Sequence, residues 1–78
     1  MKPSLGRIVL VRIGTDRDGK PVYRPAIIVN VWSDTCINVQ IFFDGTNDAA
    51  YIKEFGLGWL TSIVEGAGVG EWMWPPRT

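Results

Sequence analysis

Residues 36–43 read Cys36-Ile37-Asn38-Val39-Gln40-Ile41-Phe42-Phe43, and this stretch decides the fold class. Apolar and polar side chains alternate along it with a period of two residues, which is the pattern of a β-strand with one face in a core. One face carries Ile37, Val39, Ile41 and Phe43, and the other carries Asn38, Gln40 and Phe42. The stretch therefore predicts a strand that needs partners from the rest of the chain.

Four other apolar segments can supply those partners, at residues 7–13, 22–32, 59–65 and 71–74. They are rich in β-branched and aromatic residues, polar turns with Gly and Pro separate them, and none has a sustained helical period. Pro25 cannot donate to a strand ladder, so we expect regular pairing in the second segment to begin at Ala26. The chain is predicted to be all-β, with five short strands.

The segment between the third and fourth strands breaks this pattern. Residues 49–55 could form one or two helical turns, with Asn47 or Asp48 as the N-cap and Gly56 and Gly58 at the end. Five short strands with one longer interruption suit a small SH3-like barrel that carries a short helical or irregular insert between strands 3 and 4. We expect residues 1–78 to form a single domain whose thin core would benefit from self-association.

Composition excludes several classes of function. Eight Lys plus Arg balance eight Asp plus Glu, so an extended nucleic-acid groove is not expected. The chain has no His and one Cys, which removes imidazole bases, His-ligated metals and internal disulfides. The apolar run before Arg12 is too short for a signal sequence or a membrane span. We therefore expect an intracellular protein with no cofactor, no metal site, no membrane partner and no enzymatic activity.

The second and third strands have apolar residues on both faces. In the second strand, Ile27, Val29 and Val31 share one face, and Ala26, Ile28, Asn30 and Trp32 share the other. If the second and third strands pair through the turn at Ser33, the face with Ile27, Val29 and Val31 is the core face. The opposite face would then gather Trp32, Asn30, Asn38, Gln40 and Phe42. Such an uncharged aromatic and amide surface suits a subunit interface or a neutral ligand face, and the alternative is ordinary mixed surface.

The four tryptophans are candidates for core packing or for stacking against a nucleobase. We expect Trp32 and Trp59 to pack. Trp72 and Trp74 are two residues apart and precede Pro75-Pro76-Arg77, an arrangement that could form a flat pocket in which a base stacks and a phosphate meets a guanidinium. The candidate ligand-binding residues are Arg24, Trp72, Trp74 and Arg77.

Two segments of the first half, Gly6-Arg7-Ile8-Val9 and Arg24-Pro25-Ala26-Ile27-Ile28-Val29, resemble the start of the MazF/PemK-type endoribonuclease toxins. These toxins are SH3-like barrels that dimerise and cut RNA with the matching arginine and a Ser or Thr at the end of the next strand. The resemblance implies a barrel fold and makes Arg24 the catalytic candidate of a ribonuclease alternative. The hydroxyl position of that family falls near Phe42 or Asp44, where this chain has no Ser or Thr.

A second set of motifs spans the whole chain. In order, these are Gly6-Arg7-Ile8-Val9, residues 24–28, Val31-Trp32, residues 39–43, Asp44-Gly45-Thr46-Asn47-Asp48 and residues 70–77. This combination is similar to small proteins of unknown function that tailed phages and prophages encode, which end in G-x-W-x-W-P-x-R. Met73 stands where those proteins often have His. The resemblance implies a phage origin and assigns no activity.

Together these observations predict a non-enzymatic, phage-encoded binding protein that acts in the host cytoplasm as a homo-oligomer. In its narrowest form it is a host-immunity antagonist that sequesters a small anionic signal, such as a cyclic nucleotide, in a pocket built by subunit contact. A host defence protein is another partner compatible with these features. The alternatives are a virion structural or assembly protein and a MazF-like endoribonuclease.

Overall fold

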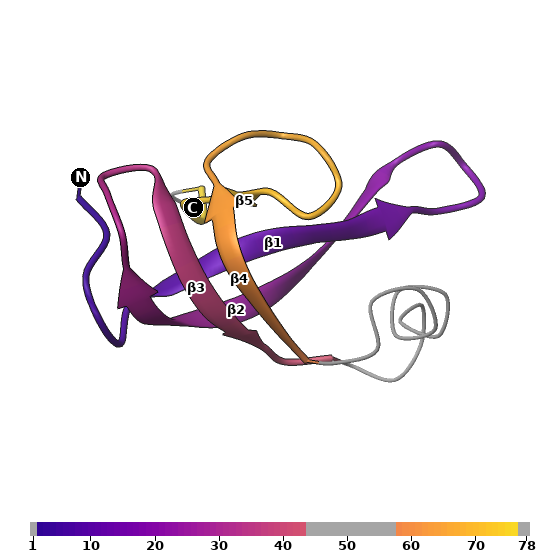
Figure 1. Cartoon of the computed structure of the whole chain (residues 1–78). Helices are drawn as coiled ribbons and strands as arrows, with labels where there is room; N and C mark the ends of the chain where they lie inside the picture. Colours follow the sequence, from indigo (N-terminus) through magenta and orange to yellow (C-terminus); the bar gives the residue numbers. More distant parts are fainter. Residues whose placement is uncertain (1, 44–57, 77–78) are drawn as a thin grey trace.

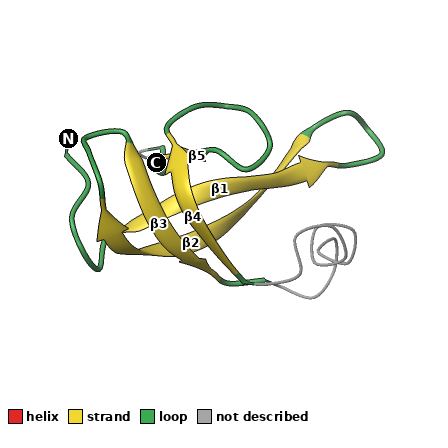
Figure 2. Ribbon diagram, viewed as in Figure 1, coloured by secondary structure: helices red, strands yellow, loops and turns green. Residues whose placement is uncertain are grey.

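A computed structural model describes residues 2–43 and 58–76 of the chain (Figure 1). It contains five strands: β1 (Ile8–Thr15), β2 (Pro21–Val31), β3 (Cys36–Ile41), β4 (Trp59–Val64) and β5 (Trp72–Met73). Figure 2 shows that strands and loops make up the described part. The predicted helical or irregular insert at residues 49–55 lies outside the described residues. Within residues 2–43 and 58–76 there is no helix with the length and hydropathy of a transmembrane span.

The strands form one antiparallel sheet in the order β4-β3-β2-β1-β5. The sheet curls on itself into a half-barrel (Figure 1). At one end, Glu65 pairs with Trp72 in an isolated parallel bridge, and the Gly66 amide donates to the Trp72 carbonyl at 3.0 Å. The end of β4 therefore meets β5 and draws the two ends of the sheet together. The predicted all-β, barrel-like class is confirmed.

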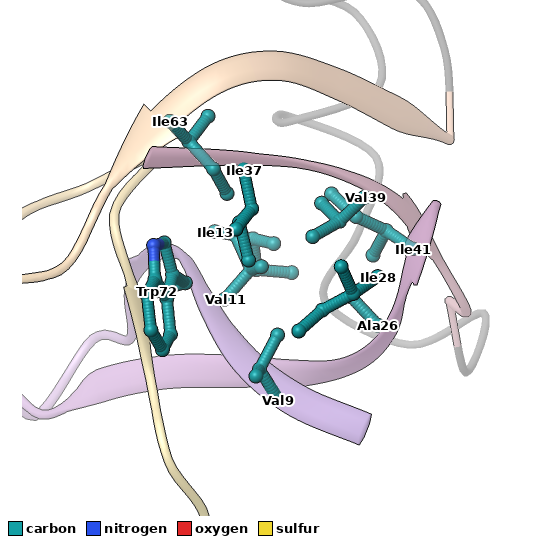
Figure 3. Packing of buried hydrophobic residues seen from close by; sticks show 10 residues of the cluster. All are labelled: Val9, Val11, Ile13, Ala26, Ile28, Ile37, Val39, Ile41, Ile63 and Trp72. Carbon is teal, nitrogen blue, oxygen red and sulfur yellow. The ribbon is translucent and has the colours of Figure 1, made fainter. Parts of the chain in front are cut away.

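The core fills the inner face of the curled sheet (Figure 3). Its ten buried apolar side chains come from all five strands and are Val9, Val11, Ile13, Ala26, Ile28, Ile37, Val39, Ile41, Ile63 and Trp72. On β3 the predicted alternation is confirmed, because Ile37, Val39 and Ile41 are buried and Phe43 packs against the same cluster. The alternation of buried and outward side chains along the strands thus leaves the outer face of the sheet open to contacts outside the core.

The prediction for the two faces of β2 is wrong at the four positions from Ala26 to Val29, because of a β-bulge at Val29. Ile28 pairs with Val39 and Asn30 pairs with Asn38, so one step along β3 corresponds to two steps along β2. The extra residue shifts the alternation by one. Ile28 is therefore buried, Val29 is 53% exposed, and Val31 packs against the core as expected. Ile27, on the side opposite Ile28, also faces away from the core.

Pro25 lies inside β2, opposite Leu10, so the prediction that regular pairing begins at Ala26 is also wrong. The Pro25 carbonyl accepts a hydrogen bond from the Phe42 amide at 2.9 Å, which means that the backbone polar atoms of Pro25 point toward the β3 side. Ala26 and Ile41 form the last β2–β3 pair. The missing N–H of Pro25 thus falls at the end of the β2–β3 ladder, where it interrupts no pair inside the ladder.

The glycine-rich loop from β4 to β5 lies against the carboxylate of Glu71. The Gly68 amide donates to Glu71 Oε1 at 2.8 Å, and a Cβ on Gly66 or Gly68 would collide with that carboxylate. Arg12 Nη1 donates to the Ala67 carbonyl at 2.9 Å. These contacts support the conformation of the loop, and the loop leads directly to the buried Trp72 of β5.

Candidate binding surface

The outer face of the sheet, on the side away from the core, carries a row of large side chains across four strands. Ile8 of β1 pairs with Ile27 of β2, Ile27 pairs with Gln40 of β3, and Gln40 pairs with Trp59 of β4. Directly opposed residues in an antiparallel sheet point to the same side. Since Gln40 points away from the core, the whole row does so, and Ile8 and Trp59 are exposed.

The neighbouring row of the outer face is also apolar. Leu10 pairs with Met73 on one side and with Pro25 on the other, and the Phe42 amide bonds to the Pro25 carbonyl. Phe42 is exposed, and Leu10 and Met73 are half-buried. Apart from Gln40, the paired residues of the two rows are apolar, so large apolar side chains lie next to one another across the sheet.

Charged side chains are missing from this face of three adjacent strands. β2, β3 and β4 contain one charged residue, Arg24, and it is buried on the inner face. We call the resulting surface the uncharged outer face. Its residues are Ile27, Val29, Asn30, Trp32, Asn38, Gln40, Phe42, Trp59 and Val64. A surface with aromatic side chains and no charge has the composition of the centre of a protein interface.

All five residues of the sequence-predicted interface lie on the uncharged outer face. Gln40 and Phe42 are exposed, Asn30 and Asn38 are half-buried and paired, and Trp32 follows β2. Trp32 Nε1 donates to Asn38 Oδ1 at 2.8 Å. The structure adds further members to this surface, because the bulge at Val29 turns Ile27 and Val29 outward. No signal in the sequence places that bulge.

The prediction that Trp32 and Trp59 pack inside is wrong. Trp32 is 61% exposed and Trp59 is 47% exposed. Trp59 occupies the outward position of β4 because its partner Gln40 faces outward on β3. The strand register could have placed Trp59 correctly, had the β3–β4 pairing been known.

Two of the predicted ligand-binding residues share one cross-strand row on the inner face. Arg24 and Trp72 both pair with Val11, one from each side. Trp72 is completely buried, and its Nε1 donates to the Thr35 carbonyl at 2.9 Å. Its ring meets Trp74 edge to face, with centroids 5.4 Å apart. In this structure the Trp72 ring is part of the core and presents no exposed face to a ligand.

Arg24 lies across β1 from this tryptophan and is buried, with 8% of its surface exposed. Its Nη1 donates to the carbonyl of Tyr23 at 2.9 Å, so at least one of its donors is used within its own strand. Arg77, the last of the predicted ligand-binding residues, lies outside the described residues. The inner row of Arg24, Val11 and Trp72 is thus buried together with the core, between the core positions Val9 and Ile13 of β1.

Arg7, which was not among the sequence-predicted site residues, contacts the ring of Trp74. The guanidinium carbon of Arg7 lies 5.4 Å from the centroid of the Trp74 ring, within the range of a cation–π contact. Arg7 is exposed and Trp74 is half-buried. Residues at opposite ends of the chain carry no sequence signal of this contact, which tertiary structure alone creates.

Comparisons of the chain with protein-family models, with curated proteins and with solved structures gave no match.

Proposed function

We propose that this chain is a non-enzymatic binding protein that self-associates through its uncharged outer face. The observation that carries this proposal is the charge pattern of β2, β3 and β4, whose one charged residue is buried. A soluble surface formed by three neighbouring strands normally carries several charged side chains, since Lys, Glu, Arg and Asp are rarely buried and frequent outside. Their absence supports a surface that another protein covers.

The exposed aromatic side chains of the face supply a substantial share of the area of a standard interface. A stable contact buries about 800 Å² on each partner. Three aromatic side chains, Trp32, Phe42 and Trp59, are each about half exposed and together offer on the order of 300 Å² of apolar area. Exposed Val29 and Val64 and the Asn and Gln amides add further area to the face. The amides would also supply hydrogen bonds at the rim.

A second copy of the chain is the partner that this chemistry favours. Two uncharged faces can meet without removing water from any ionised group, which is the main cost of burying a polar interface. An isologous contact between identical faces closes as a dimer and exposes no new surface. A domain of 78 residues has a small core, so the added burial also stabilises its fold.

A lysine on the outer face is expected to break this association. Val29→Lys would place one charge from each copy inside the contact, and burying an unpaired charge at an interface costs about 2 kcal/mol or more. We expect the dimer dissociation constant to rise at least about thirtyfold. Val69→Lys is the matched control, because Val69 is 50% exposed against 53% for Val29 but lies in the loop between β4 and β5.

Sedimentation equilibrium over a range of concentrations measures both variants. The proposal requires a wild type that dimerises, a Val29→Lys variant shifted to monomer and a Val69→Lys variant that behaves as wild type. A wild-type protein that stays monomeric at every concentration would contradict the proposal of self-association. Equal loss of association in both variants would show that charge, rather than the outer face, is responsible.

A second candidate function is the sequestration of a small anionic ligand such as a cyclic nucleotide. The contact between Arg7 and Trp74 favours it, since it combines an exposed guanidinium with an aromatic ring. A base could stack on the indole while the guanidinium binds a phosphate. Arg24 is buried within the core, which supports a packing role for it over the RNA cleavage of the toxin-like alternative.

Calorimetry against a panel of cyclic di- and trinucleotides tests this second candidate. We expect heat of binding from at least one member of the panel, and a loss of at least about tenfold in affinity in Arg7→Ala, since hydrogen bonds to charged groups contribute about 1.5–3 kcal/mol. Arg17→Ala is the control, because Arg17 is an exposed arginine in the β1–β2 turn. A folded wild type that gives no heat with any member rules the ligand class out.

A further inference from the structure

Trp32, the most exposed aromatic residue of the uncharged outer face, is held in place by contacts within its own chain. Trp32 is 61% exposed, yet its one polar atom, Nε1, donates to Asn38 Oδ1 at 2.8 Å. Its backbone is fixed as well, since the Trp32 amide donates to the Cys36 carbonyl at 2.9 Å. An exposed indole ordinarily leaves its N–H to water and its side-chain torsions free.

The acceptor of this bond is itself fixed by β4. Asn38 Oδ1 also accepts from the Ser62 amide at 2.7 Å, so both lone pairs of the oxygen are used. Because both partners are N–H donors, only the oxygen of the Asn38 amide can face them. Three segments of the chain, after β2, in β3 and in β4, therefore converge on one atom.

Ser62 has the backbone conformation that this bond requires, at a cost. Asn38 lies opposite a bulge in β4, since Ile37 pairs with Ile63 while Val39 pairs with Leu60. Within that bulge Ser62 has a φ of 54°, in the left-handed region that is unfavourable for a residue other than glycine. The fold thus maintains a locally unfavourable conformation at the point where it holds Asn38.

From these contacts we infer that Trp32 is the anchor of the self-association surface and that Asn38 is the residue that positions it; this inference rests on the proposed function. A satisfied N–H leaves the Trp32 ring needing only apolar neighbours. The second copy provides them in Val29, Phe42 and Trp59, all exposed. Fixing the ring in advance reduces the side-chain entropy that would otherwise be lost when the two copies meet. Tryptophan is also the residue type most enriched among interface hot spots.

Ring order in the monomer tests the positioning step independently of association. In the Val29→Lys background, ¹⁵N relaxation of the Trp32 indole should give an order parameter near the rigid value of about 0.85, falling below about 0.6 when Asn38→Ala is added. Asn30→Ala is the matched control. Asn30 is the cross-strand partner of Asn38 on the same face, and its Oδ1 accepts from the Val31 amide. It should leave the indole signal unchanged.

Affinity tests the anchor. In the otherwise wild-type chain, Asn38→Ala should weaken the dimer about threefold to tenfold, and Trp32→Ala at least about thirtyfold. If Asn38→Ala does not fold, Trp32→Phe replaces it, since the shorter ring has no N–H for Asn38 and should also lose about threefold to tenfold. A Trp32 indole that is mobile in the monomer, or a dimer indifferent to Trp32→Ala, overturns the inference. A dimer broken by Val29→Lys but not by Trp32→Ala would overturn this inference and leave the proposed function standing.

Discussion

Replacing Trp72 with alanine is expected to lower the free energy of unfolding by about 3–5 kcal/mol. Trp72 is completely buried at the point where β5 meets both β1 and the end of β4. Its removal would leave a cavity, strip the Thr35 carbonyl of its indole donor and remove the edge-to-face contact with Trp74. Small domains have about 5–15 kcal/mol of stability in total, so most of the chain should be unfolded at modest urea concentrations.

Trp59→Ala is the matched control for Trp72→Ala. The same change of side chain at a 47% exposed position should cost about 1 kcal/mol or less. Urea denaturation at low protein concentration, followed by circular dichroism, measures both variants without a contribution from self-association. Similar midpoints for the two variants would contradict the assignment of Trp72 to the core.

The second large effect is expected from a pair of adjacent residues on β2. Ile28→Ala should destabilise the fold by about 2–5 kcal/mol, since Ile28 is almost completely buried among the core side chains (Figure 3). Val29→Ala should cost less than about 1 kcal/mol, since Val29 is the outward residue of the bulge. Uninterrupted alternation, with Val29 and Val31 on the core face and Ile28 outside, would give the opposite order.

The same denaturation experiment distinguishes these two arrangements. A larger loss in Val29→Ala than in Ile28→Ala would place the bulge elsewhere and remove Val29 from the uncharged outer face. Val31→Ala adds a check on the far side of the bulge. Because Val31 packs against the core, its truncation should cost more than that of Val29.

The all-β class followed from local patterns that tertiary structure did not override. The strict alternation in residues 36–43 survives in β3, where Ile37, Val39 and Ile41 are buried. The other four strands begin and end within a few residues of their predicted bounds. A period of two residues is a property of the extended backbone itself, so it can be read without knowledge of the partner strand.

The candidate site was predicted only in part, for reasons that lie in strand pairing. Asn38, Gln40 and Phe42 were placed on the outer side because β3 is regular. Ile27 and Val29 were not, because a bulge is set by how two strands align and leaves no mark in either sequence alone. The burial of Trp72 and the exposure of Trp32 and Trp59 likewise depend on which strand each residue faces.

The sequence by itself therefore determined that this protein is a small set of β-strands with an uncharged aromatic and amide surface on two of them. Only the tertiary structure decided which tryptophans belong to the core and which to that surface, and only it brought Arg7 to Trp74 and Ser62 to Asn38. The physical reason is that alternation fixes the relative facing of residues within one strand. The absolute facing of each strand depends on the register, bulges and curling of the whole sheet.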